Sequence, residues 1–161
     1  MAINISSNNK GVAGSLSNFT PHPFILDGVT CNSMEGFLQS LKYENPDMQK
    51  HVASLVGRKA KFKGQKKKWY VKQILYWQGT AYKRDSPEYT KLIERAFDAY
   101  AQNTKVQKIL LSTNDAVFEH TMGKKKKNFT VLTRNEFVSN LTRIRKNIRQ
   151  QKDAERNFSH D

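Results

Sequence analysis

Apolar residues recur every three or four positions in five stretches of the chain, the spacing that places them on one face of an α-helix. The stretches span about residues 34–42, 46–56, 87–102, 106–113 and 134–150. Residues that cap helix N-termini precede four of them. These caps are Asn32 or Ser33, Asn45-Pro46, Ser86-Pro87 and the capping box Thr133-x-x-Glu136. The pattern therefore predicts about five helices.

Strand signals are shorter than the helical ones. Phe24–Leu26 and Val29–Cys31 flank an Asp27-Gly28 pair, which tolerates the positive φ of a tight hairpin turn. Three further short strands are predicted, near residues 2–5, 118–120 and 129–132. The fold class expected is α+β, with about five helices around a small, mostly antiparallel sheet.

The chain reads as a single domain over residues 1–161, because no repeat or linker divides it. Residues 1–15 are rich in Ser, Asn and Gly and are interpreted as a flexible arm, and residues 151–161 as a polar tail. No apolar run has the length of a membrane span, and the N-terminus lacks the apolar core of a secretory signal. With one cysteine, Cys31, no internal disulfide can form. These features favour a cytoplasmic setting.

The balance of charge points to polyanionic partners. The chain has 28 basic and 14 acidic residues, a formal net charge of +14, which attracts nucleic acid, nucleotides and pyrophosphates. Two basic runs, Arg58–Lys68 and Lys124–Lys127, are each read either as solvated loops or as phosphate contacts. Trp69 follows the first run and can stack on a base or belong to the core, whereas Trp77 is expected in the core.

Three polar residues share a second face of the first predicted helix. Glu35, Gln39 and Lys42 stand at positions i, i+4 and i+7. From spacing alone the face is either a solvated flank or the wall of a site. No phosphate-binding P-loop, dinucleotide fingerprint or metal-ligand cluster is present, and Cys31 has no partner histidine at a recognisable spacing. No metal or cofactor is expected, and an enzyme of this sequence must rely on carboxylates.

Several strings, in order along residues 17–145, resemble the YbiA-like, or NADAR (NAD and ADP-ribose associated), family. They are Asn18-Phe19, Pro23-Phe24-x-Leu26-Asp27-Gly28, Ser33-x-Glu35-x-x-x-Gln39-x-x-Lys42, Trp69 after a basic segment, and Phe118-Glu119-His120-Thr121. The string Tyr82-x-Arg84-x-Ser86 is similar to a phage and bacterial branch of the family. A phage source would place the protein in the cytoplasm of a bacterial host.

The resemblance implies hydrolysis of an N-glycosidic bond. Its substrates would be ADP-ribose or NAD derivatives, ADP-ribosylated nucleic-acid bases or ribosylated pyrimidines. Glu35 would orient water or stabilise the ribosyl cation, and Glu119 with His120 would complete the pocket and protonate the leaving group. The implied substrate-binding residues are Asn18, Phe19, Asp27, Gly28, Gln39, Lys42, Trp69 and Arg84.

The chain departs from the family after His120. Many members continue with an Asp and a Trp-Gly, whereas this chain has Met122-Gly123 and then four lysines. The departure leaves two alternatives open beside the hydrolase: an ADP-ribose binder that has lost catalysis, and a non-catalytic nucleic-acid-binding or nucleotide-binding accessory protein. The exact substrate and the oligomeric state are left open.

Overall fold

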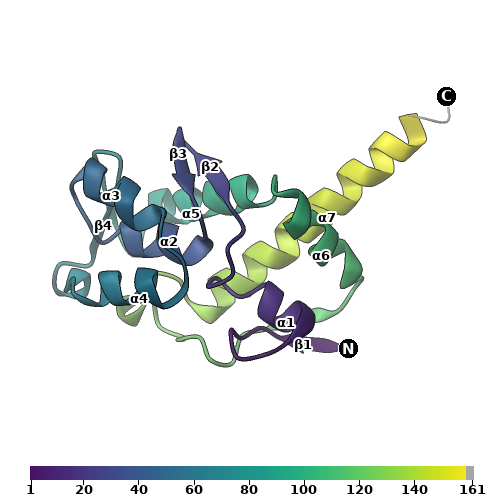
Figure 1. Cartoon of the computed structure of the whole chain (residues 1–161), viewed down its shortest axis with the longest axis horizontal. Helices are drawn as coiled ribbons and strands as arrows, with labels where there is room; N and C mark the ends of the chain where they lie inside the picture. Colours follow the sequence, from purple (N-terminus) through teal and green to yellow (C-terminus); the bar gives the residue numbers. More distant parts are fainter. Residues whose placement is uncertain (159–161) are drawn as a thin grey trace.

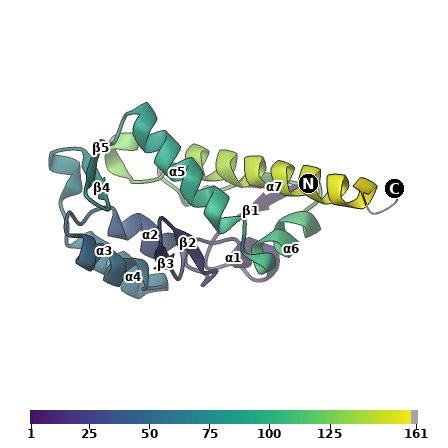
Figure 2. The same ribbon diagram turned by 90° about the horizontal axis from the view of Figure 1, so that it is seen from above.

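The computed structural model describes residues 1–158, which form seven α-helices, six short β-strands and two 3₁₀ turns (Figure 1). In chain order these are β1 (Ala2–Asn4), α1 (Gly11–Ser15), β2 (Phe24–Leu26), β3 (Val29–Cys31), α2 (Met34–Ser40), α3 (Pro46–Ala53), α4 (Gly57–Gln65), η1 (Trp69–Val71), β4 (Ile74–Trp77), β5 (Thr80–Lys83), α5 (Pro87–Tyr100), α6 (Thr104–Ser112), β6 (Val117–Glu119), η2 (Lys127–Phe129) and α7 (Arg134–Phe158). Figure 2 shows two layers: α5 and α7 form one, and α2, α3, α4 and the β2–β3 hairpin form the other. None of the helices within residues 1–158 has the length and apolar character needed to span a bilayer.

The α+β class is confirmed, and the five predicted helices correspond to α2, α3, α5, α6 and α7. Their predicted caps are in place. The Ser33 hydroxyl accepts a hydrogen bond from the Gly36 amide at 3.0 Å. In the capping box, the Glu136 carboxylate accepts from the Thr133 amide at 2.8 Å, and the Thr133 hydroxyl accepts from the Glu136 amide at 3.1 Å.

Two helices lie in segments that the sequence did not mark as helical. α1 falls within the predicted arm. α4 occupies most of the basic run Arg58–Lys68, for which a solvated loop was one of the two interpretations. Gly57, which directly follows the predicted helix at 46–56, is the first residue of α4, with φ +56°. The lysines of this run are spaced along a helix rather than spread over a loop.

The strands form three separate pairs instead of one sheet. β2–β3 and β4–β5 are antiparallel hairpins, with Phe24 opposite Cys31 and Ile74 opposite Lys83. β1 and β6 are parallel. The β4–β5 hairpin was missed, since no strand was predicted between residues 74 and 83. The strand predicted at 129–132 is wrong: this segment leaves η2 and enters α7 without pairing.

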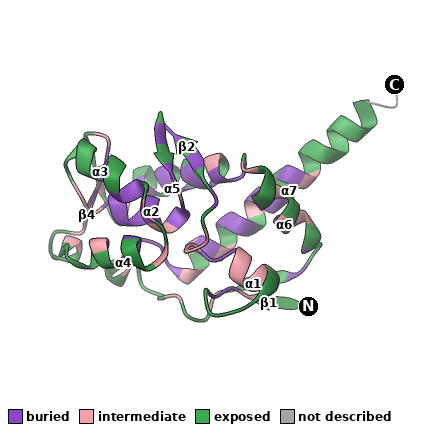
Figure 3. Cartoon of the chain, viewed as in Figure 1, coloured by how far each residue is buried: buried purple, intermediate pink, exposed green. Residues whose placement is uncertain are grey.

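The N-terminal segment is packed against the rest of the fold, which corrects the prediction of a flexible arm. β1 pairs with β6, Ile5 is fully buried, and its amide donates to the Glu119 carbonyl at 2.8 Å. At the other end, α7 continues to Phe158 as an exposed helix that projects from the body (Figures 1 and 3). Residues 159–161 of the predicted tail lie outside the described residues.

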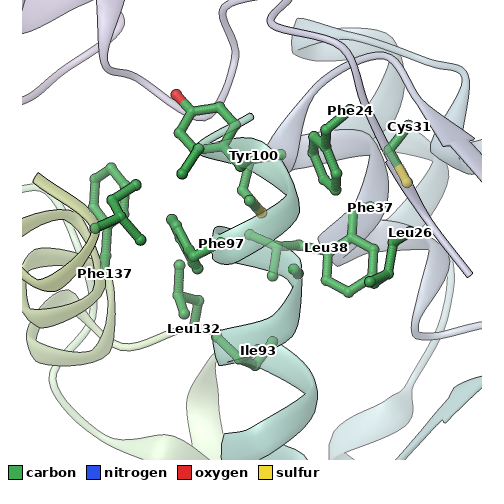
Figure 4. Close-up of a cluster of buried hydrophobic side chains, with 14 of the residues drawn as sticks. Phe24, Leu26, Cys31, Phe37, Leu38, Ile93, Phe97, Tyr100, Leu132 and Phe137 are labelled. Carbon is green, nitrogen blue, oxygen red and sulfur yellow. The ribbon is translucent and has the colours of Figure 1, made fainter. Parts of the chain in front are cut away.

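The core is centred on α5, with side chains from both layers around it (Figure 4). Phe97 and Tyr100 of α5 lie between Phe137 of α7 and Phe24 of the hairpin. Trp77 is buried as predicted, 5.1 Å from the Phe37 ring. The rings meet edge to face, the geometry that aromatic pairs favour.

Candidate functional site

The site begins with how α2 is held. The Ser33 hydroxyl donates to the Leu55 carbonyl at 3.0 Å, and a β-carbon on Gly36 would lie 2.4 Å from the same carbonyl oxygen. Only glycine allows so close an approach. Because Phe37 and Leu41 are buried on the core side of α2, the face that bears Glu35, Gln39 and Lys42 is turned to the α4 side.

Glu35 and Gln39 are hydrogen-bonded one helical turn apart. The Gln39 Nε2 donates to Glu35 Oε1 at 2.8 Å, and the Glu35 amide donates to the Asn18 carbonyl at 3.0 Å. Glu35 is half-buried. Burial raises the pKa of its carboxyl, an effect that outweighs the Gln39 hydrogen bond and the positive charges of Lys42 and Lys61. A carboxylate with a raised pKa is better placed to take up a proton near neutral pH.

The rest of the Gln39 amide faces α4. Gln39 is 8% exposed, and its Oε1 is buried without a hydrogen-bond partner. The Lys42 ammonium lies 3.5 Å from the Gly64 carbonyl of α4. Burial lowers the pKa of Lys42, which the Glu35 carboxylate opposes and the nearby charge of Lys124 reinforces. The polar face of α2 is therefore covered by α4, with the positive charge of Lys124 nearby.

A cleft of about 350 Å³ opens beside Lys42. Its lining combines lysines with aromatic and aliphatic side chains. These residues are Lys42, Glu44, Lys67, Lys68, Trp69, Val71, Lys72, Ile74 and Tyr76. Trp69 is half-buried and packs partly on the hydrophobic core. The cleft suits a ligand that carries both negative charge and a flat ring.

Glu119 and His120 line a different, smaller cleft of about 210 Å³, together with Arg134. The His120 Nδ1 lies 2.7 Å from the Ile5 carbonyl, to which it donates, and the ring meets Phe137 edge to face. Gly123 packs against the same ring. The next residue is Lys124, whose positive charge helps to lower the pKa of Lys42, so the loop after His120 runs from this cleft toward Lys42. Glu119 and His120 thus line this second cleft, whereas Glu35 is not among the residues that line it or the cleft beside Lys42.

Asp27 and Gly28 form the tip of the β2–β3 hairpin, as predicted, with φ +49° and +77°. The Asp27 carboxylate is engaged within the fold: it accepts two hydrogen bonds from Arg95, at 2.8 and 3.1 Å, and one from Trp77 Nε1 at 2.9 Å. The guanidinium of Arg95 holds the pKa of Asp27 below its usual range. The Asp27 carboxylate therefore ties the hairpin to α5 and β4, and the role of Asp27 and Gly28 in substrate binding stays a prediction.

Arg84 is also a structural residue. Its side chain is 1% exposed and forms a bidentate ion pair with Glu136, at 3.2 and 2.5 Å. Its Nε donates to the Thr130 carbonyl at 2.8 Å, and the guanidinium stacks on Tyr89. These contacts engage all three guanidinium nitrogens and join the end of β5 to the start of α7, and the role of Arg84 in substrate binding stays a prediction.

Other site residues were not singled out from the sequence. Lys61 and Gly64 of α4 and Lys124 of the loop belong to the surroundings of Glu35 and Lys42. The basic runs gave the only signal for the lysines, and nothing marked Gly64. Asn18 and Phe19 are half-buried, and Asn18 contributes its carbonyl to the Glu35 amide.

Comparison with known proteins agrees with this fold. Residues 10–146 match the family described as Bacteriophage protein GP30.3. An uncharacterised 17.1 kDa protein of the Gp30-rIII intergenic region of Enterobacteria phage T4 is 31% identical over 149 residues, which cover 91% of this chain and 98% of that protein. The NMR structure of the E. coli protein YbiA superposes with a TM-score of 0.61 and 18% identity, covering 94% of this chain and 89% of the other. The chain therefore belongs to the bacteriophage protein GP30.3 family and has a YbiA-like fold.

Proposed function

We propose that the protein is an N-glycosidase-type hydrolase that acts on an ADP-ribose or NAD derivative, or on a ribosylated base such as an ADP-ribosylated nucleic-acid base. The observation that carries the proposal is the half-buried Glu35 carboxyl, which has a raised pKa, is fixed by Gln39 and lies beside lysines. The resemblance of the sequence to YbiA-like proteins supplies the class of reaction.

The chemistry suits a single well-placed carboxylate. As the bond between ribose C1′ and the base nitrogen breaks, its electron pair leaves with the base and positive charge develops on the sugar. Glu35 stabilises that charge, or takes a proton from the water whose oxygen bonds to C1′, and a proton ends on the released base. Lys42 would contact sugar hydroxyls or phosphate, and Gln39, whose Oε1 is buried against α4, would hold the Glu35 carboxylate in place.

The cleft beside Lys42 would hold the rest of the substrate. Lys67, Lys68 and Lys72 supply positive charge for a pyrophosphate, and the Trp69 ring supplies a stacking surface for the base. The predicted roles of Glu119 and His120 stay predictions, because these residues line the neighbouring cleft.

The test is release of free base, measured by mass spectrometry. NAD, an ADP-ribosylated oligonucleotide and a ribosylaminopyrimidine would each be incubated with the wild type, with Glu35→Gln and with Glu94→Gln. Glu94 is an exposed carboxylate of α5 and is the matched control. We expect base release by the wild type and by Glu94→Gln, and loss of at least about a hundredfold in Glu35→Gln. Full activity of Glu35→Gln excludes the assignment, and Glu119→Gln and His120→Gln in the same assay test the second cleft.

A second candidate function is binding without catalysis, of ADP-ribose or of nucleic acid. It is favoured by the lysines that surround the site from α4 and from the loop at 124–127. ADP-ribose that raises the melting temperature without any base release would support it. An affinity for nucleic acid that falls steeply with salt would also support it, since lysine contacts to phosphate release counterions. In either case we propose the cytoplasm of a bacterial host as the place of action.

A further inference from the structure

The 3₁₀ turns η1 and η2 lie side by side, although they are far apart in the sequence. The Gln73 side-chain amide donates to the Tyr70 carbonyl at 2.9 Å and to the Asn128 carbonyl at 3.0 Å. The backbone amide of Gln73 also donates to the Trp69 carbonyl at 2.9 Å, and Gln73 adopts φ +57°. Gln73 thus has an uncommon backbone conformation, and its side chain links the two turns.

These two turns expose large apolar side chains. Tyr70 is 51% exposed, Val71 71% and Phe129 60%. Scattered exposed apolar residues are ordinary on a protein surface, but these three are carried by two turns that a single amide bridges. Val71 also lines the cleft beside Lys42, so the exposed surface continues into the candidate site.

Both segments that carry the exposed apolar side chains are rich in lysine. The segments 66–72 and 124–129 contain eight lysines and no acidic residue. Lys127 pairs with Asp85 at 3.1 Å, and Lys67 and Lys68 also line the cleft. We call Tyr70, Val71, Phe129 and these eight lysines the aromatic–lysine surface. Its positive charge selects a polyanion, and its rings select a polyanion that offers flat apolar faces.

We propose that the aromatic–lysine surface binds single-stranded nucleic acid, with the bases stacked on Tyr70 and Phe129 and the phosphates on the lysines. Exposed bases are the requirement, because stacking within a duplex hides the base faces, and each base–ring stack contributes measurably to affinity without sequence preference. Since Val71 and Lys72 belong to the cleft rim, a bound strand would pass the mouth of the cleft. The step from strand binding to cleavage of a base on that strand rests on the proposed function, whereas strand binding itself does not.

The test is fluorescence anisotropy with labelled, unmodified 12-nucleotide oligothymidine, the same length of oligouridine, a 12-base-pair DNA duplex and anionic lipid vesicles. The double variant Tyr70→Ala/Phe129→Ala is expected to bind the single strand at least about tenfold more weakly with an unchanged salt dependence, because it loses stacking and keeps the lysines. Lys67→Gln/Lys126→Gln is expected to bind more weakly with a shallower salt dependence. Phe158→Ala removes an 86% exposed ring at the far end of α7 and is the control.

Tyr70→Phe/Phe129→Tyr keeps both rings and should bind like the wild type, which separates stacking from any disturbance of the turns. The proposal is overturned if the duplex or the vesicles bind as tightly as the single strand, or if Tyr70→Ala/Phe129→Ala binds like Phe158→Ala. A comparison of the affinities for oligothymidine and oligouridine shows whether the surface prefers DNA or RNA. Strand binding without base release leaves the surface standing and removes the hydrolase. Base release without strand binding would support the hydrolase and exclude the proposed role of the aromatic–lysine surface.

Discussion

The side-chain oxygen of Gln39 fills the space that a β-carbon at position 64 would occupy. A β-carbon built on Gly64 would lie 1.7 Å from Gln39 Oε1 and 3.0 Å from the Gln39 β-carbon. Gly64 is buried within α4, where glycine is a poor helix former. Its presence there allows α4 to approach α2 closely enough to hold the Gln39 amide against Glu35.

Gly64→Ala should therefore break the link between Gln39 and Glu35. The methyl group displaces the amide, and the overpacking is expected to lower the free energy of unfolding by about 1–3 kcal/mol despite the better helix propensity of alanine. Urea unfolding measures the stability. Base release should fall even at temperatures where the variant is folded.

The control is Gln65→Ala, one residue further along α4 and exposed. It should change neither stability nor activity appreciably. A Gly64→Ala variant more stable than the wild type by about 1 kcal/mol, the gain expected from helix propensity alone, would contradict the close contact described here.

Ionisation of Glu35 should cost stability. Because burial raises the pKa of this carboxyl in the folded protein, the folded state binds the proton more tightly than the unfolded state does. The cost is absent below the unfolded pKa of about 4.3 and complete above the raised folded pKa. Glu35→Gln can still accept the Gln39 hydrogen bond but cannot ionise. Its melting temperature should exceed that of the wild type at pH 8, and the gap should close toward pH 4.

The same scan with Glu94→Gln should show no such convergence, because Glu94 is exposed. If the wild type is more stable than Glu35→Gln at pH 8, the attraction of Lys42 and Lys61 for the Glu35 carboxylate outweighs the cost of burying its charge. In that case Glu35 would be an ordinary paired carboxylate.

The helices could be predicted because each carries its own signal. Ser33, Ser86 and the Thr133–Glu136 capping box start helices at the predicted residues. α4 was missed for a physical reason: lysines dominate it, and Ala60 and Gly64 are its only buried residues. A helix that packs through such small residues leaves almost no apolar periodicity to detect.

The candidate site could be predicted only where its residues lie within one helix. Spacing alone puts Glu35, Gln39 and Lys42 on one face of the predicted helix; in the structure Glu35 and Gln39 lie on α2, and Lys42 lies beside them just past its end. The surroundings come from α4 and from the loop at Lys124, a contact between distant segments that no local pattern encodes. The structural partners of Asp27 and Arg84 could not be predicted for the same reason, since a motif does not show that these two residues form ion pairs with Arg95 and Glu136.

Arg84 should matter for folding and not for ligand binding. Arg84→Ala leaves the Glu136 carboxylate without its guanidinium in a site where the arginine is almost fully buried, and the free energy of unfolding should fall by about 3 kcal/mol. Glu136→Gln should give a smaller loss, because the amide oxygen can still accept from the Thr133 amide. Urea unfolding measures both, with Lys83→Ala on the exposed side of β5 as the control.

Titration calorimetry with ADP-ribose separates the two roles of Arg84. The folded fraction of Arg84→Ala should bind with wild-type affinity. A variant of unchanged stability that no longer binds would restore Arg84 to the substrate site.

The ion pair between Asp27 and Arg95 should make a small contribution to stability that depends on pH. Arg95 lowers the pKa of Asp27 in the folded protein, so the contribution is present above the unfolded pKa of about 3.9 and is lost as pH falls through the lowered folded pKa. Both side chains are more than a third exposed, which limits the contribution to less than about 1 kcal/mol.

Asp27→Asn keeps the acceptor for Trp77 and tolerates the positive φ of the turn, so it isolates the charge. Its melting temperature should lie slightly below that of the wild type at pH 7 and meet it near pH 2, whereas Asp153→Asn, on the exposed end of α7, should follow the wild type throughout. If Asp27 instead served the ligand, Asp27→Asn would leave the stability at pH 7 unchanged and weaken ADP-ribose binding.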